Sequence, residues 1–401
     1  MGHRANRDEL CHIRPYGGAG NRMAGLRSVI LGRMITKLRA ATAQWTVVVP
    51  VVSFVVLVLT WHKDLPGWAV GVVAVFLMAA VLSAVHHAEV IAHWSGEPFG
   101  SLVLAVAVTV IEVALIVTLM ADGGDKSSTL ARDTVFAAVM ITCNGILGLS
   151  IIVAAIKYRT AVFNAEGTGT ALACIATLAT LSLVLPTFTT SSPGPQFSTT
   201  QLSYAAAASL VVYGLFVTTQ TLRHRDYFLP VTPEGKVRRL EEEDHAAPPT
   251  LRAAGVSLLL LAVALVAVVG LAKGVSPTIE SAVEDAGLPH AVVGVIIALM
   301  VLLPETIAAL RAAARNRVQT SLNLALGSAL ASIGLTIPAV AVASAWLEGP
   351  LVLGLEPSHL VLLTLTVVLG TLTVIPRRAT LLQGALHLAL LAEFVVLAVN
   401  P

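Results

Sequence analysis

The sequence predicts an all-α, polytopic membrane protein of about eleven transmembrane helices, with two inverted five-helix repeats and one extra N-terminal helix. Composition is the first reason, because 56% of the 401 residues are hydrophobic and only 12% are charged. Soluble domains carry about 25% charged residues. The second reason is that long apolar runs follow one another along the chain. The mean hydropathy of +0.84 agrees, so a lipid bilayer is the solvent that suits this chain.

Each predicted helix is an apolar run of roughly 20 residues, which crosses about 30 Å of hydrocarbon. The extra N-terminal helix is expected over residues 45–62, after a basic cytoplasmic tail at 1–44. Residues 66–222 form the predicted first repeat and residues 253–400 the second. The predicted helices of the two repeats are 66–85, 98–121, 133–156, 169–190 and 202–222, then 253–272, 290–310, 321–346, 352–375 and 379–399.

The longest polar stretch, residues 223–252, separates the two predicted repeats. A half that contains an odd number of spans must enter the membrane from the opposite side when it is repeated, so the halves are expected to be inverted. The stretch contains the run EEED at 241–244. Such a run is typical of a solvated linker.

The basic residues predict the orientation, because cytoplasmic loops are enriched in Lys and Arg. With a cytoplasmic N-terminus, all 25 Lys and Arg residues fall in cytoplasmic segments except four. Those four are Lys63, Lys126, Arg132 and Lys273. We therefore expect a membrane protein with its N-terminus in the cytoplasm and its C-terminus outside.

Two glutamates interrupt the apolar runs: Glu112 in AVAVTVIEVALIV and Glu305 in ALMVLLPETIAAL. An ionised carboxylate at a helix centre costs roughly 2.5–3.5 kcal/mol on insertion scales, which makes intramembrane acids candidates for functional sites. No Lys or Arg lies in the middle of a predicted span, so a buried ion pair cannot explain these two. Protonated glutamates with a purely structural role are the alternative.

A cation site near the membrane midplane would use both glutamates. Calcium binds 6–8 oxygen ligands, and proline can supply some of them by leaving a carbonyl without its helical donor. Pro304 does this for the carbonyl of Met300, and Pro338 does it for that of Gly334. Two adjacent carboxylates in a low dielectric resist ionising together, whereas a bound cation expels their protons. Binding of cations and of protons at one site would then exclude each other, which is the basis of exchange.

The motifs GEPFGSLVLAVAVTVIEVALI (96–116) and LPETIAALRAAARNRVQTSLNLALGSALASIGLTIP (303–338) resemble those of the bacterial ChaA-type calcium/proton antiporters. These belong to the calcium/cation antiporter superfamily. The resemblance implies two inverted five-helix repeats plus one N-terminal helix, and cation export driven by the proton gradient in the inner membrane. It also implies that an acidic linker such as 241–244 could attract calcium or respond to it.

The resemblance assigns site residues as well. Glu112 and Glu305 match the two central acids, Asn144 in ITCNGILG resembles a ligand-bearing Asn, and Ser328 in LGSALAS resembles the Ser of the second repeat. The sequence departs from the family where many relatives have amides. The departures are Val108-Thr109 and Val301-Leu302 in place of Gly-Asn, and Ala331 in place of Gln. Fewer amide oxygens weaken the case for calcium, so sodium or potassium stays open as the transported ion.

A histidine-rich stretch, HHAEVIAHWSGEP at 86–98, lies at a predicted cytoplasmic helix end. Such clusters bind metals or respond to pH near neutrality, which suggests cation entry or pH sensing. A simple solvated helix end is the alternative. The residues concerned are His86, His87, Glu89, His93 and Glu97.

These features predict a secondary active cation/proton antiporter that exports Ca²⁺ in exchange for H⁺, and not an enzyme. A Na⁺(K⁺)/H⁺ antiporter and a passive cation channel are the alternatives. The sequence has no Gly-rich phosphate loop followed by Lys, so ATP-driven pumping is not indicated. ADGGD at 121–125 has the wrong spacing for an intramembrane protease. We expect no cofactor, no nucleic acid, and inorganic cations, protons and lipid as the partners.

Overall fold

The structure is a computed structural model that describes residues 45–61, 63, 65–96, 99–123, 128–232, 249–346 and 349–401. The chain divides into two compact units, Met1–Val48 and Val49–Pro401. Everything below concerns the second unit. The predicted basic tail, Glu97 and the acidic run 241–244 lie outside the described residues.

The predicted class, a polytopic all-helical membrane protein, is confirmed. Among the described residues, nine helical segments are long and apolar enough to cross a membrane, and two shorter apolar helices cover Trp45–Thr60 and Val106–Ala121. Each predicted span coincides with one of these segments. Two are longer than expected: the span at 66–85 continues to Ser95, and the span at 253–272 continues as one helix to Asp285 through Pro277.

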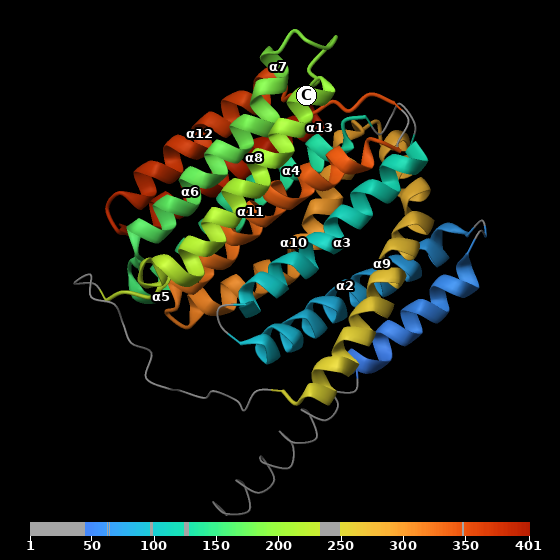
Figure 1. Cartoon of the computed structure of the whole chain (residues 1–401), viewed down its shortest axis with the longest axis horizontal. Helices are drawn as coiled ribbons and strands as arrows, with labels where there is room; N and C mark the ends of the chain where they lie inside the picture. Colours follow the sequence, from blue (N-terminus) through green and yellow to red (C-terminus); the bar gives the residue numbers. More distant parts are fainter. Residues whose placement is uncertain are drawn as a thin grey trace, which may run out of the picture. The chain divides into compact units, whose positions relative to one another are not determined.

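The helices of the first half follow one another with short connections (Figure 1). Three of the apolar spans are not regular α-helices throughout, because each contains a π-helical segment, η2, η3 or η4. The elements are α2 (Gly67–Ser95), α3 (Phe99–Gly123), α4 (Leu130–Met140), η2 (Ile141–Ile146), α5 (Leu147–Tyr158), β1 (Ala161–Val162), α6 (Ala165–Ala179), η3 (Thr180–Val184), α7 (Leu185–Phe188), α8 (Thr199–Thr218), η4 (Thr219–Arg223) and η5 (Arg225–Phe228).

The second half begins at Leu251, beyond the linker. Its helices α10 and α11 each continue through an internal proline, Pro304 and Pro338. The elements are α9 (Leu251–Asp285), α10 (Ala291–Ala314), α11 (Val318–Ala343), α12 (Pro357–Val374), β2 (Arg378–Ala379) and α13 (Leu381–Val399). We call the end of the bundle that carries Arg223 and Leu251 the linker side, and the opposite end the far side.

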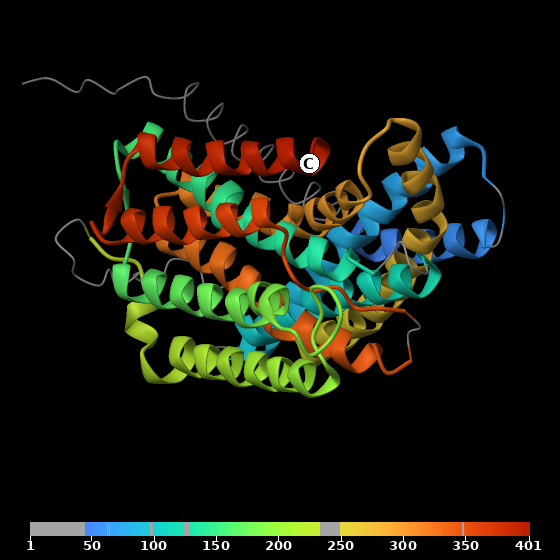
Figure 2. The same cartoon turned by 90° about the horizontal axis from the view of Figure 1, so that it is seen from above.

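The apolar side chains form two clusters. One joins α4–α8 with α11–α13, the other joins α2, α3 and α9, and α10 contributes side chains to both. Figures 1 and 2 both show α2 and α9 together on one side, away from α6, α8 and α12. The second cluster is closely packed at Gly270 of α9. A Cβ atom added there would lie only 2.5 Å from the Leu57 side chain.

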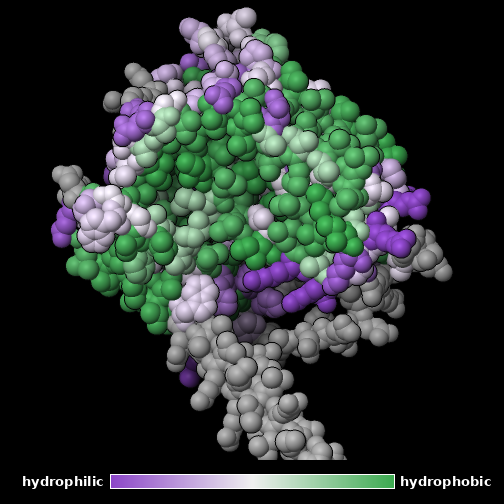
Figure 3. All heavy atoms as spheres, turned by 180° about the vertical axis from the view of Figure 1, so that it is seen from behind, coloured by the Kyte–Doolittle hydropathy of each residue, from purple (hydrophilic) through white to green (hydrophobic). Residues whose placement is uncertain are grey.

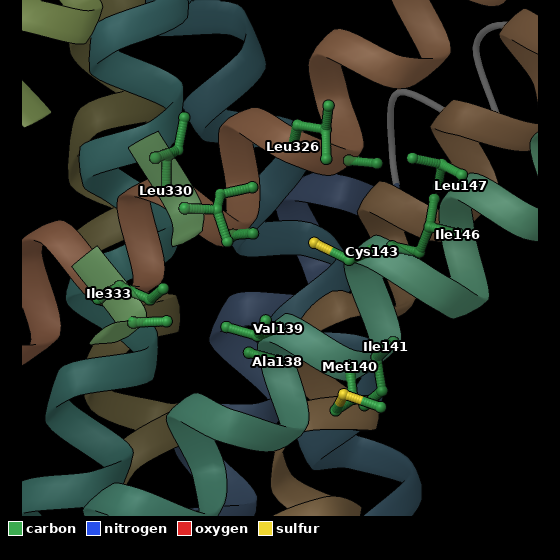
Figure 4. Packing of buried hydrophobic residues seen from close by; sticks show 14 of the residues in the cluster. Ala138, Val139, Met140, Ile141, Cys143, Ile146, Leu147, Leu326, Leu330 and Ile333 are labelled. Carbon is green, nitrogen blue, oxygen red and sulfur yellow. The ribbon is translucent and has the colours of Figure 1, made fainter. Parts of the chain in front are cut away.

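Helix α11 is the centre of the first cluster and contacts α3, α6, α8 and α10. Its side chains Leu326, Leu330 and Ile333 pack with those of the η2 segment, including Cys143 (Figure 4). A π-helical turn widens a helix locally and is frequent at functional sites. This arrangement places an irregular turn of the first half against the motif helix of the second.

Polar ties hold the two halves together at both ends. On the linker side, β1 pairs antiparallel with β2, with Ala161 opposite Ala379. On the far side, the buried Arg132 Nε lies 2.7 Å from Asp133 Oδ1, and an Arg132 terminal nitrogen lies 3.3 Å from Glu356 Oε1 at the start of α12. These groups occupy helix ends, where water is nearest.

The surface between the two ends suits lipid. The face shown in Figure 3 is apolar across its middle, with hydrophilic residues gathered toward its margins. Exposed aromatic residues such as Trp68 and Trp346 lie near helix ends, as expected for aromatic side chains at a membrane interface. A bilayer would therefore cover the exposed apolar side chains of this unit.

Candidate functional site: a carboxylate-lined cavity

A cavity of about 370 Å³ lies between the two halves of the chain. Both predicted glutamates line it, Glu112 from α3 and Glu305 from α10. Glu89 from α2 is a third carboxylate on its wall. The cavity reaches the linker side, because Gln220, Arg225 and other residues near the end of α8 also line it.

Glu112 is buried and held by a residue that sequence reasoning did not single out. The Ser332 hydroxyl on α11 donates a hydrogen bond to Glu112 Oε1 across 2.5 Å. Both residues are buried, with exposed fractions of 5% for Glu112 and 1% for Ser332. A hydroxyl donor favours a carboxylate acceptor, so Ser332 orients Glu112 at the closed end of the cavity. Ser332 lies four residues after Ser328 in the quoted motif, and this helical spacing was the signal for it.

Glu305 follows Pro304 directly, and both residues line the cavity. Its Oε2 atom is buried and has no hydrogen-bond partner among the described residues. Its carboxyl group lies close enough to Glu112 and Glu89 to interact with them electrostatically. Buried carboxylate oxygens normally have partners, so an unpartnered one facing a shared cavity is available for a proton or a cation.

Asn144 lies elsewhere, in the η2 segment, and does not line the cavity. Its amide nitrogen donates to Thr366 Oγ1 across 2.9 Å, and its Oδ1 lies 3.0 Å from Nδ1 of the buried His387. Because an amide oxygen can only accept, His387 Nδ1 is the donor in this pair. Thr373 Oγ1 lies 3.2 Å from His387 Nε2 and completes the network. The Asn144 oxygen is therefore already occupied by a histidine.

The other predicted ligands divide between the cavity and its surroundings. Ser328 lines the cavity together with Thr109. Met300 is partly buried in the second apolar cluster, and neither it nor the buried Gly334 lines the cavity. The carbonyls of Met300 and Gly334 still precede Pro304 and Pro338 by four residues within continuous helices, so each lacks a helical N–H donor.

The histidine stretch is spread around α2. Glu89 faces the cavity, whereas His87 is buried with its Nδ1 3.3 Å from the Ser257 hydroxyl on α9. The His86 ring lies 5.5 Å from that of His87, and His93 is exposed in the last turn. Among the described residues, no three His, Cys, Asp or Glu side chains converge closely enough to hold a metal. The three cavity carboxylates thus share a space without forming a closed coordination shell.

Arg225 was not singled out from the sequence, and it lines the cavity together with Asn323 of the quoted motif. Asn323 Nδ2 also donates to the Phe228 carbonyl across 2.7 Å. Nothing in the local pattern around Arg225 distinguishes it, because the fold brings it to the cavity from a distant segment. Glu393 on α13 is a further carboxylate within a candidate span, but it is exposed on the surface and away from the cavity lining.

Comparison with known proteins agrees with this architecture. Residues 65–222 and 256–400 match the family described as sodium/calcium exchanger protein. The chain belongs to this family. The matched segments flank the linker and cover both cavity glutamates. The resemblance to the calcium/cation antiporter superfamily is thereby confirmed, and the protein is a membrane-embedded ion exchanger.

Two relatives of this exchanger align over most of its length. It is 46% identical to a Sinorhizobium fredii (strain NBRC 101917 / NGR234) protein with the provisional name ionic transporter y4hA, over 89% of this chain and 96% of that protein. It is 33% identical to the sodium-potassium/proton antiporter ChaA of Escherichia coli (strain K12), over 88% and 95% of the two chains. The crystal structure of the H⁺/Ca²⁺ exchanger CAX shares its fold, with a TM-score of 0.65, 13% identity, and coverage of 89% and 92%.

Proposed function

We propose that this exchanger is a secondary active cation/proton antiporter of the bacterial inner membrane, in which Glu112 and Glu305 bind either the cation or protons. One observation carries the proposal: two intramembrane carboxylates, one from each half, line the same cavity. Carboxylates that share one cavity repel each other when both are ionised, and either protons or a cation relieve that repulsion. Occupation by one excludes the other, and alternating access then couples their movements.

Calcium is the cation that the cavity chemistry favours. The cavity wall carries three carboxylates, from Glu89, Glu112 and Glu305, and two hydroxyl oxygens, from Thr109 and Ser328. Hard divalent cations bind such oxygens, with water completing the shell. Ser332 would hold Glu112 in place, and Glu89 would attract the cation on its way from the linker side. Asn144 would act through its network with His387 and Thr366, or as a ligand only after leaving it.

Sodium or potassium is the second candidate, and a specific observation supports it. The wall beside Glu112 carries Val108 in place of an amide, and Leu302 lies buried one turn before Glu305. Monovalent cations require fewer anionic ligands than calcium does, and ChaA, the 33% identical relative, is named a sodium-potassium/proton antiporter. The same two glutamates would serve either cargo.

Everted membrane vesicles with a preformed acid interior test both cargoes. We expect added Ca²⁺ to dissipate the pH gradient, because cation entry drives proton exit. Dissipation by Na⁺ or K⁺ but not by Ca²⁺ would assign the second cargo. Cation entry into sealed liposomes without any proton movement would instead identify a passive channel and reject antiport.

The proposed orientation places the linker side in the cytoplasm. The linker side carries the described basic residues Lys157, Arg223, Arg315 and Arg377 at or next to helix ends. Retention of Lys and Arg on the cytoplasmic side gives a cytoplasmic N-terminus and an external C-terminus. The cavity would then be open to the cytoplasm, as a cation exporter requires for loading. Movement of α2 and α9 against the remaining helices would open the far side.

A further inference from the structure

Helix α11 carries a row of three hydroxyl side chains spaced four residues apart: Ser328, Ser332 and Thr336. Residues with this spacing share a helix face, and each step rises about 6 Å along the axis. Ser328 lines the cavity, and Ser332 donates to Glu112 at its closed end. Thr336 is therefore the next hydroxyl beyond Glu112, toward the far side.

Thr336 differs from most threonines in these helices. It is completely buried, with an exposed fraction of 0%, and its Oγ1 has no hydrogen-bond partner among the described residues. By contrast, Thr142, Thr306 and Thr366 each donate to the carbonyl four residues earlier, at 2.7–2.8 Å. Buried polar groups in folded proteins normally have a partner, and those that lack one call for a specific explanation.

A threonine hydroxyl is a neutral oxygen ligand of the kind that binds alkali and alkaline-earth cations. Thr336 does not line the cavity on the linker side.

We propose that the Thr336 hydroxyl forms a relay site for the transported cation on the far side of Glu112. This inference rests on the proposed antiport function and extends it by assigning part of the exit route. A neutral hydroxyl oxygen binds a cation more weakly than a pair of carboxylates does. The cation would therefore load at Glu112 and Glu305, and would contact Thr336 only as it leaves.

The test compares Thr336→Val with Thr336→Ser in everted vesicles. Valine keeps the shape of threonine but removes the oxygen, whereas serine keeps the oxygen. We expect Val to lower the maximal exchange rate about tenfold, the effect of losing one hydrogen-bond-strength contact. The apparent affinity on the loading side should stay unchanged, and Ser should retain most of the rate. Thr371→Val is the matched control, because Thr371 is exposed on α12 and donates to the Val367 carbonyl.

Two results would overturn the relay site. One is a Thr336→Val protein that exchanges cations as fast as the parent; the other is a Ser variant as slow as the Val variant. A thermal unfolding scan checks that the purified Val variant is folded. If the Val variant is unstable, the Ser variant decides: a stable Ser variant that is equally slow also counts against the site. Glu305→Gln separates the two proposals. If it also exchanges normally, the antiport site itself is wrong, whereas if only Thr336→Val exchanges normally, the relay alone is wrong.

Discussion

The Ser332 hydroxyl on α11 donates to Glu112 on α3 across 2.5 Å, at the closed end of the carboxylate-lined cavity. This bond connects the motif helices of the two halves through one atom pair. The donor stabilises one position of the carboxylate, so in the proposed function the bond would define where the cation finds this ligand. The proposed function therefore depends on a serine as well as on the two acids.

Ser332→Ala should weaken cation binding. A hydrogen bond to a charged group contributes roughly 1.5–3 kcal/mol, so the apparent affinity should fall at least about tenfold. Ser332→Thr keeps the hydroxyl and should restore much of that affinity. Calorimetric titration of the purified protein with CaCl₂ or NaCl measures the change. An unchanged affinity in the Ala variant would show that Glu112 is oriented by other groups.

Glu112→Gln and Glu305→Gln should each insert normally and lose exchange to background, because Gln neither carries a proton nor balances a cation. Glu393→Gln is the matched control, since Glu393 is an exposed carboxylate on a membrane helix outside the cavity lining. Vesicle pH-gradient assays, normalised to the amount of membrane-inserted protein, compare the three. Near-normal exchange by either cavity variant would reject the role of that glutamate.

Cation binding should release protons from the purified protein. If cations and protons compete for Glu112 and Glu305, adding Ca²⁺ to a weakly buffered solution lowers its pH. The same competition predicts that the apparent cation affinity rises as pH rises, because fewer competing protons remain. A pH-sensitive dye records the release, and the double variant Glu112→Gln/Glu305→Gln is the control. Binding without release would point to a site that does not exchange protons.

His387 and Asn144 should behave as a structural pair. Removing the histidine leaves the buried Asn144 oxygen without its donor, which costs about 1–3 kcal/mol. His387→Leu and Asn144→Leu should therefore lower the thermal unfolding temperature by similar amounts and change cation affinity little. If Asn144→Leu abolishes binding while His387→Leu does not, Asn144 is a cation ligand in another state of the cycle.

Gly148→Val should destabilise the protein by separating α5 from α13. Even a Cβ at this position would lie 2.9 Å from the Gly384 carbonyl and 3.0 Å from His387 Cβ. Overpacking of this kind costs typically about 1–3 kcal/mol. Gly214→Ala is the control, since a Cβ there meets nothing within 4 Å. Thermal scans in detergent should show a lower midpoint for the first variant and an unchanged one for the second.

The sequence predicted the helices because the physics of spanning hydrocarbon leaves a strong one-dimensional signal. Runs of about 20 apolar residues are needed whatever the helices contact, so most boundaries agree within a few residues. The lengths of α2 and α9 were missed because their last turns, from His86 in α2 and near Glu280 and Asp285 in α9, are polar. The π-helical segments η2, η3 and η4 were also missed, because tertiary packing selects them and local pattern does not.

The site was only partly predictable. Glu112 and Glu305 stand out because a carboxylate in an apolar run is costly, and the structure brings both to one cavity. Ser332 has no such cost in a small-residue helix, so its four-residue spacing from Ser328 was the only signal for it, and its bond to Glu112 on α3 reveals its role. Asn144 fits a ligand motif equally well in sequence, but in the fold its side-chain oxygen accepts a hydrogen bond from a buried histidine 243 residues away.

The two-residue strands β1 and β2 restrict how this exchanger can move. Ala161 and Val162 pair with Ala379 and Arg378, and the Phe163 amide adds a bond of 3.2 Å to the Arg377 carbonyl. Apolar helix faces can slide past one another, but directional backbone bonds hold a fixed register. The turn between α5 and α6 is therefore joined to the turn between α12 and α13, and we expect these four helices to move as one frame. In the proposed transport cycle, the helices that change position would then be ones outside this frame, α2 and α9 above all.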